Sequence, residues 1–349
     1  MTDAATSTLP MGHQPGDTVI HDGFGSPHAG DTISIITRLF GWAMLTMLVA
    51  WFLNRVLTLT YEWPGALRLF DGGGALSAVQ AVFYVAALVV AAGIVFGTRD
   101  MPLRVDSLRI SEFNKAVVRA CFFIVLFVGI GDVIVSALRV EGVLGSIVGS
   151  DLERELGRSQ FRGPWLHVPL AILGIVVSLF VRTLGFHWLT LMIVGAELLI
   201  VITRFVFSYE QAFMGDLVRF WYAALFLFAS AFTLLEEGHV RVDIFYAGMA
   251  NRSKGRVNTL GTLFLGIALC WTILIVGLGG KSSIVYGAVA NFEVSQSGFG
   301  LYVKYFMAAF LAVFAVTMLI QFVSYLMESV ADSRGDPGTR LDRGDVVAH

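Results

Sequence analysis

The chain has 349 residues, of which 56% are hydrophobic and only 14% are charged, and its formal net charge is −2. Soluble domains are on average about 45–50% apolar and about 25% charged, so this chain has too few polar residues to cover a soluble globule of its size. The small negative charge, without a long basic cluster, argues against nucleic acid as a partner. We therefore expect an all-α, polytopic membrane protein with lipids around it.

The first 32 residues are rich in Gly, Pro, Asp, Ser and His and contain neither Lys nor Arg. A secretory signal needs a basic segment before its apolar core, so this stretch is predicted to be a disordered cytoplasmic tail. Its histidines are irregularly spaced and have no Cys or Glu partners, which argues against a metal site. Cys121 and Cys270 fall inside apolar runs, where we expect small buried residues rather than a disulfide.

Eight apolar runs are long enough, or nearly so, to cross about 30 Å of hydrocarbon, for which a helix needs about 20 residues. They are residues 33–59, 75–97, 116–138, 165–181, 187–207, 217–235, 258–279 and 301–327. The fourth and fifth form one stretch broken only by Arg182 and His187. A single helix over that stretch would span about 65 Å, so a hairpin turning near residues 182–185 is the better interpretation.

The basic residues of the loops predict the orientation. With the N-terminus inside, the cytoplasmic segments hold Arg38, Arg99, Arg104, Arg109, Lys115, Arg241, Arg252, Lys254, Arg256, Arg334, Arg340 and Arg343. Loops clear of the helices on the other side hold Arg68, Arg154, Arg158, Arg162 and Lys281. The positive-inside rule therefore predicts about eight transmembrane helices with both termini in the cytoplasm. Residues 151–156 have the pattern of a short surface helix on the outer face.

Three ionisable residues lie inside the apolar runs. Asp132 lies deep in the third run, Glu197 lies midway along the fifth, and Arg204 follows two turns later. Such residues are costly in hydrocarbon and usually face protein or water. Two interpretations stay open for the carboxylates: an ion or proton relay, or an interhelical hydrogen bond or ion pair that fixes packing.

The chain has no recognisable catalytic or cofactor motif. His167 and His187 open the fourth and fifth runs at opposite depths, which disfavours ligation of a haem by both. The common haem-attachment, nucleophile-elbow, zinc-protease and phosphate-loop patterns are all missing from the sequence. We therefore expect no enzyme, no catalytic residue, no metal and no cofactor.

The most distinctive local feature follows the sixth apolar run and reads Glu-Glu-Gly-His-Val-Arg-Val-Asp over residues 236–243. Gly238 is placed to end the helix, as a C-cap glycine does. Apolar and polar residues then alternate. On the residues alone, the segment is either a charged cytoplasmic loop or a stretch that runs along the membrane surface.

This element resembles the signature of the small permease subunit of TRAP transporters, the tripartite ATP-independent periplasmic systems. The resemblance extends over roughly residues 193–330 and places the element after the second of four family helices. The residues that carry it are Glu237, Gly238, His239, Arg241 and Asp243. It implies a structural or partner-docking role for them. Where the family often has a Trp-x-Glu-Glu element, residues 213–218 contain one carboxylate, Asp216.

The resemblance also implies a division of the chain. Residues 1–32 are the cytoplasmic tail, 33–186 a four-helix N-terminal membrane extension, 187–330 the small-permease-like unit, and 331–349 a cytoplasmic C-terminal tail. The chain then looks like an enlarged variant of the family.

A small subunit of this family would bind a large permease subunit in the bacterial inner membrane. It would act with a periplasmic solute-binding protein in sodium-driven uptake of an organic acid or related small solute. Two other functions stay open at this stage. The first is a self-sufficient channel or carrier that uses Asp132 and Glu197. The second is a membrane anchor subunit of an oxidoreductase.

Overall fold

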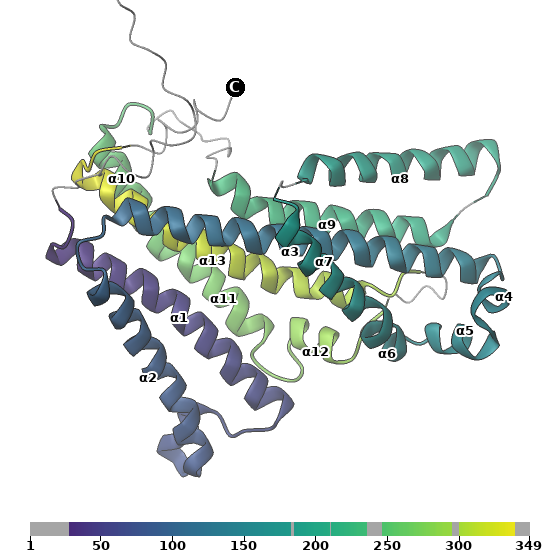
Figure 1. Cartoon of the computed structure of the whole chain (residues 1–349), viewed down its shortest axis with the longest axis horizontal. Coiled ribbons are helices and arrows are strands. Elements are labelled where there is room, and N and C mark those ends of the chain that lie inside the picture. Colours follow the sequence, from purple (N-terminus) through teal and green to yellow (C-terminus); the bar gives the residue numbers. More distant parts are fainter. Residues whose placement is uncertain (1–27, 183–184, 210, 236–245, 295–299, 339–349) are drawn as a thin grey trace, which may run out of the picture.

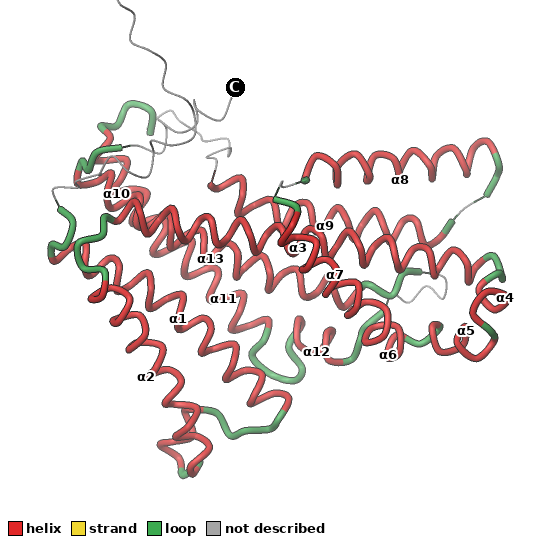
Figure 2. Tube along the Cα trace, in the orientation of Figure 1, coloured by secondary structure: helices red, strands yellow, loops and turns green. Residues whose placement is uncertain are grey.

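The computed structural model describes residues 28–182, 185–209, 211–235, 246–294 and 300–338. All regular structure in these ranges is helical, which confirms the all-α prediction (Figure 2). The elements are α1 (Thr32–Thr60), η1 (Ala66–Asp71), α2 (Gly74–Gly97), α3 (Leu103–Val140), α4 (Leu144–Val148), α5 (Ser150–Leu156), α6 (Ser159–Arg162), η2 (Gly163–His167), α7 (Val168–Phe180), α8 (Phe186–Val206), α9 (Ala212–Leu235), α10 (Asn251–Gly261), η3 (Thr262–Ile267), α11 (Ala268–Gly277), α12 (Ile284–Ala290) and α13 (Lys304–Arg334).

Within the described ranges, eight helices are long and apolar enough to cross a membrane, as predicted. Six are single elements, and two are composite: α6, η2 and α7 form Ser159–Phe180, while α10, η3 and α11 form Asn251–Gly277. The fourth and fifth spans are separate, since α7 ends at Phe180 and α8 begins at Phe186. This confirms that the stretch is two spans and not one long helix. The short helix expected at residues 151–156 is also present, as α5.

The third span begins earlier than predicted. Helix α3 has 38 residues and starts at Leu103, whereas the apolar run starts at residue 116. At about 1.5 Å per residue it is about 57 Å long, well beyond the hydrocarbon thickness. Its first turns are polar, but Arg104, Asp106 and Asn114 are buried against other helices. Hydropathy alone therefore predicts a loop over residues 103–115, whereas contacts with other helices stabilise a helix there.

Helices α3 and α13 lie side by side and antiparallel at the centre of the molecule (Figure 1). Helix α3 packs against α7, α9 and α13, and α13 packs in addition against α10, α11 and α12. Ser111 and Asn114 of α3 face Ser324 and Gln321 of α13 across this contact, and all four are buried. The core therefore crosses the sequence boundary at residue 186, because α3 belongs to the extension and α13 to the last four spans.

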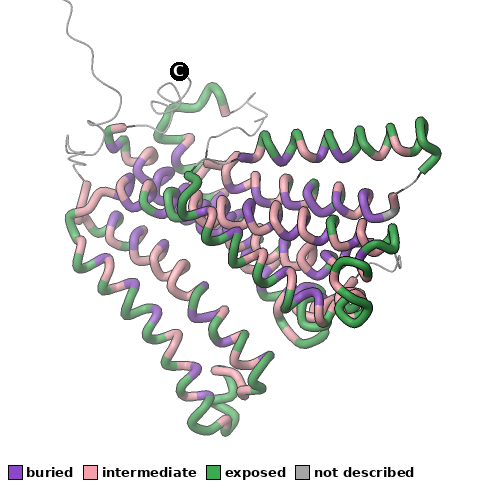
Figure 3. The backbone as a smooth tube through the Cα atoms, turned by 45° about the vertical axis from the view of Figure 1, so that its right-hand side comes forward, coloured by how far each residue is buried: buried purple, intermediate pink, exposed green. Residues whose placement is uncertain are grey.

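The α1–α2 hairpin and α8 lie at the periphery. Helix α2 contacts α1 and η1 and diverges from the central helices along its length, whereas the end of α1 stays beside α11 and α12 through the Trp51–Trp271 ring contact and the Tyr286–Leu59 hydrogen bond (Figure 1). Helix α8 packs chiefly against α9, and most of its surface is exposed in Figure 3. Exposed apolar side chains on both elements fit helices that face lipid or another protein.

Gly174 allows the backbones of α3 and α7 to approach each other closely. A Cβ at this position would lie 2.6 Å from the backbone nitrogen of Ile124, whereas a Cβ at Gly195 of α8 would meet nothing within 4 Å. We expect Gly174→Ala to push the two helices apart and to destabilise the protein by about 1–3 kcal/mol. Gly195→Ala is the matched control and should be neutral or slightly stabilising, because Ala favours helix.

The measurement for this pair is the fraction of monodisperse protein that survives heating in detergent, followed by size-exclusion chromatography. Equal survival of the two variants would contradict the assignment of Gly174 as a close-contact residue.

Candidate functional site

A fully buried polar cluster surrounds Asp132, near the C-terminal end of α3. One carboxylate oxygen accepts hydrogen bonds from Arg162 Nη1 and His167 Nε2, each at 2.9 Å. The other accepts the backbone N–H of Tyr302 at 2.8 Å. Asp132, Arg162 and His167 are all 0% exposed. A buried carboxylate held by a guanidinium and two further donors is satisfied within the protein.

His167 extends the cluster to the last helix. Its Nδ1 lies 2.7 Å from the hydroxyl of Tyr305 on α13. Because the carboxylate of Asp132 can only accept, Nε2 bears a hydrogen, and in a neutral ring Nδ1 then accepts from the Tyr305 hydroxyl. The chain of contacts runs from α3 through η2 to α13, so it ties the N-terminal extension to the last span.

Tyr302 covers one side of the cluster through its ring and its hydroxyl group. The guanidinium carbon of Arg162 lies 4.3 Å from the centre of the Tyr302 ring, within cation–π range. The Tyr302 hydroxyl accepts from Arg139 Nη1 at 2.6 Å and donates to the backbone oxygen of Gly157 at 2.9 Å. The segment that precedes α13 is thereby held between α3 and the α5–α6 connection.

Arg162 and His167, two members of this cluster, are not among the site residues that the sequence predicts. Arg162 was counted in a loop clear of the helices, but it ends α6 inside the fourth span and is buried. The assignment of Arg162 to the basic residues of an outer loop is therefore wrong. Its guanidinium lies inside the protein, where Asp132 neutralises it. The signal for His167 was available: residues 132 and 167 lie almost equally far from a turn near residue 150, so an antiparallel pair brings them to one depth.

A second polar cluster joins the other ends of α3 and α13. Arg104 Nη1 lies 2.5 Å from Glu328 Oε1, and its Nη2 lies 2.8 Å from Asp332 Oδ1. The same nitrogen donates to the backbone oxygen of Asp336 at 2.9 Å. Arg104 and Glu328 are 4% and 2% exposed. One guanidinium therefore binds three acceptors at the end of α13.

The beginning of α1 joins this second cluster. Arg38 is fully buried and lies 2.7 Å from Asp106 of α3. Asp31, which caps α1, forms an ion pair with Arg334 at the end of α13. The hydrogen bond from Arg334 is the largest cause that holds the pKa of Asp31 well below its usual range. His28 in turn contacts Asp336 at 2.6 Å, so both ends of the described chain meet on one face.

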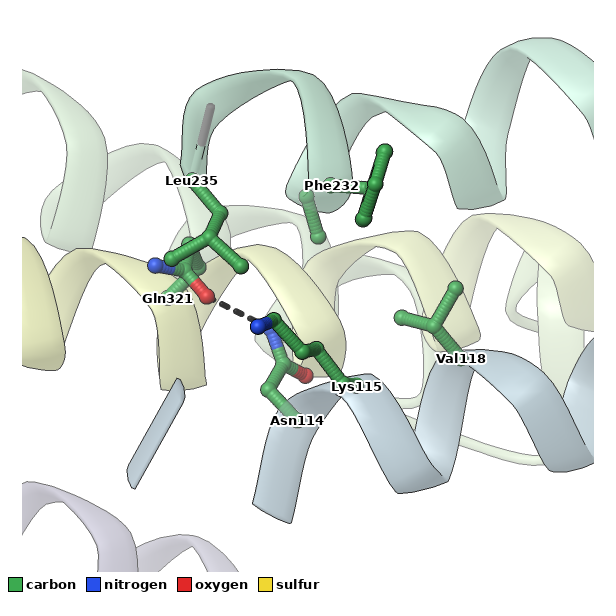
Figure 4. A pocket seen from close by; sticks show the side chains of 7 residues that line it. Asn114, Lys115, Val118, Phe232, Leu235 and Gln321 are labelled. Atoms are coloured by element: carbon green, nitrogen blue, oxygen red, sulfur yellow. Dashed lines mark hydrogen bonds between the residues drawn. The ribbon is translucent and has the colours of Figure 1, made fainter. Parts of the chain in front are cut away.

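Polar side chains continue between the two clusters. Asn114 of α3 donates to Gln321 Oε1 of α13 at 3.2 Å and to the backbone oxygen of Thr317 at 2.9 Å (Figure 4). Phe232 and Leu235 of α9 lie on the other side of this contact and line a shallow pocket with it. The cavity volume is about 10 Å³, little more than the space for one water-sized sphere. Small-molecule sites usually occupy about 300–1,000 Å³, so this pocket is a packing gap rather than a substrate site.

Glu197 and Arg204 lie apart from both clusters. They are exposed residues of α8, on the periphery of the molecule. The structure therefore does not bring Glu197 together with Asp132, as a shared ion pathway would require. Asp216, at the start of α9, accepts the backbone N–H of Leu301 at 3.1 Å and so holds the segment before α13.

The Gly-His-x-Arg-x-Asp element lies outside the described residues. Glu237, Gly238, His239, Arg241 and Asp243 all fall in residues 236–245, which follow the end of α9 at Leu235. Their role as a partner-docking or structural motif remains a prediction from the sequence. Within the described ranges, no group of three or more His, Cys, Asp or Glu side chains is arranged to hold a metal ion.

Comparison with known families assigns the second half of the chain. Residues 191–331 match the family model described as "Tripartite ATP-independent periplasmic transporters, DctQ component". The curated proteins and the solved structures compared with the chain gave no match. The matched range agrees with the span of roughly 193–330 predicted from the sequence, and it takes in most of α8 and all of the described elements from α9 to α12, with most of α13. The chain therefore carries a DctQ domain, the small-permease component of TRAP transporters, and its additional N-terminal helices are consistent with an enlarged variant of that family.

Proposed function

We propose that this protein is the small membrane subunit of a TRAP transporter in the bacterial inner membrane. It would hold a large permease subunit in place while that subunit imports an organic acid or related small solute. A periplasmic binding protein would deliver the solute, and a sodium gradient would drive uptake. The observation that carries this proposal is the DctQ match over residues 191–331.

The geometry supports a scaffold rather than a self-sufficient carrier. Secondary transporters bind substrate near the membrane midplane, between helices that are broken by extended segments. The eight described spans are continuous helices, with π-helical turns in two of them. The buried charges at Asp132 and Arg104 are bound by side chains of this same chain. A scaffold needs large complementary surfaces, which the exposed apolar helices provide.

The orientation is part of the proposal. The pairs His28–Asp336 and Asp31–Arg334 place both ends of the described chain on one face, as an even number of spans requires. The positive-inside rule favours the cytoplasm for that face.

Co-purification tests the scaffold function. We expect the tagged chain, purified from its native membranes in mild detergent, to retain a large polytopic permease subunit. Reconstituted alone in liposomes, the chain should give no solute or sodium flux. Purification without any such partner would contradict the proposal. Flux by the isolated chain would contradict it too and would favour a self-sufficient channel or carrier.

The same assay tests the Gly-His-x-Arg-x-Asp element through Arg241. We expect Arg241→Ala to lower the yield of the complex or the rate of uptake, because the resemblance gives this arginine a docking or helix-exit role. Arg340→Ala, in the C-terminal tail, is the matched control and should leave both unchanged. Normal assembly and uptake with Arg241→Ala would show that the segment only marks topology.

A further inference from the structure

Glu197 occupies an unusual position on α8. The helix runs over 21 residues, Phe186–Val206, and Glu197 lies one residue past its centre. The side chain is exposed, and so are Val194, Leu198 and Val201 beside it. A carboxylate at the middle of a span is costly in lipid and usually faces protein or water.

This chain offers Glu197 no partner among the residues that the structure describes. No ion pair or hydrogen bond joins its carboxylate to another described side chain. Arg204 is the nearest basic residue along α8, but seven residues separate the two, which is about 10 Å along the helix axis. The charge therefore needs a group that comes from outside the chain.

The residues around Glu197 form a continuous stripe, which we call the α8 flank. Its members are Thr190, Val194, Glu197, Val201 and Arg204, all exposed. They follow one another at intervals of three or four residues, so they share one side of the helix. Leu189, Ile193 and Ala196, one position earlier in each turn, are buried on the side that packs against α9. The α8 flank is thus an open strip beside an established helix contact.

Charge excludes a second copy of this chain as the occupant. Rotation about the membrane normal keeps every residue at its own depth. A two-fold pair formed through the α8 flank would therefore set Glu197 against Glu197, and two like charges at the same depth repel each other. Lipid chains offer no counter-charge at that depth. The complementary occupant is a different membrane helix with a basic or hydrogen-bond-donating side chain near its middle.

We propose that the α8 flank is the docking face for such a helix of the large permease subunit, and that Glu197 pairs with its mid-depth cation or donor. This proposal rests on the proposed function, since it names the contact through which the scaffold holds its partner. The DctQ match begins at residue 191, so the flank lies almost entirely within the matched domain.

Site-directed photo-crosslinking tests the face. A photoreactive amino acid at Val201 reports on the flank, and the same group at Gly195 reports on another side of α8, where a Cβ would meet nothing within 4 Å. In membranes that contain the whole transporter, we expect several-fold more adduct with the large subunit from Val201 than from Gly195. Equal adducts from both sites, or an adduct between two copies of this chain from Val201, would overturn the proposal.

Substitution of Glu197 tests the charge. We expect Glu197→Leu to reduce the co-purified large subunit several-fold, and Glu197→Gln to restore much of it because an amide still accepts a hydrogen bond. Glu155→Leu, at an exposed ion pair outside the apolar part of the spans, is the control. Full retention of the large subunit by Glu197→Leu overturns this proposal and leaves the scaffold function standing. Failure of the unsubstituted chain to retain the subunit overturns both.

Discussion

Asp132→Ala is expected to destabilise the protein by about 3–5 kcal/mol, because it leaves the guanidinium of Arg162 buried without its carboxylate. The loss should be visible as earlier aggregation during heating in detergent, measured by size-exclusion chromatography. It should also lower the yield of folded protein from membranes. The size of the effect follows from burial, since neither side chain is exposed to solvent.

A second variant separates charge burial from general damage to the helix. In Asp132→Leu combined with Arg162→Met, no charge is left uncompensated, so the double variant should be more stable than Asp132→Leu alone. Asp151→Ala, which breaks an exposed pair with Arg154, is the matched control and should change stability by about 0.5 kcal/mol or less. A single Asp132 variant as stable as this control would contradict the role of Asp132 in neutralising the buried Arg162.

The second large effect is expected at Arg104. Arg104→Ala removes the guanidinium that binds Glu328, Asp332 and the backbone of Asp336, and it should cost up to about 3–5 kcal/mol. Arg104→Lys should recover only part of this, because an ammonium cannot reproduce the fork that reaches two carboxylates. The same heating assay measures both variants.

The loss at Arg104 should also loosen the end of α13. We expect limited proteolysis to cleave after residue 334 faster in Arg104→Ala than in the unsubstituted protein. Arg109→Ala is the control, since Arg109 is an exposed residue of the same helix and contacts Met101. If Arg109→Ala and Arg104→Ala behave alike, the contacts at the end of α13 contribute nothing to its stability.

Hydropathy predicts the eight spans because each must be apolar over the thickness of the membrane. It fails where polar residues pair across helices. The first turns of α3 were predicted to be a basic loop, yet Arg104 and Asn114 have buried partners on α13. Hydropathy ends a predicted helix at its last apolar residue. In the folded chain the helix continues as long as its polar residues have partners on neighbouring helices.

The Asp132 cluster shows a similar limit. The sequence identified Asp132 as costly and offered an ion pair as one explanation, but it could not name Arg162, whose position just before an apolar run looks like a loop. The backbone N–H of Tyr302, another donor to Asp132, leaves no trace in residue identity at all. In contrast, the DctQ relationship was readable from a few residues after α9, although that segment lies outside the described structure.

The antiparallel pairing of α3 and α13 has a consequence for biogenesis. The ribosome delivers α3 to the membrane long before α13, with Asp132, Arg104 and Asn114 in place but Tyr302, Glu328 and Gln321 still unmade. Until α13 is inserted, these polar groups of α3 lack part of their hydrogen-bond partners. They are then exposed in the membrane or shielded by the insertion machinery. By the same reasoning, a shortened chain that begins at residue 187 inserts α13 with a glutamate and a glutamine turned towards a helix that was never made.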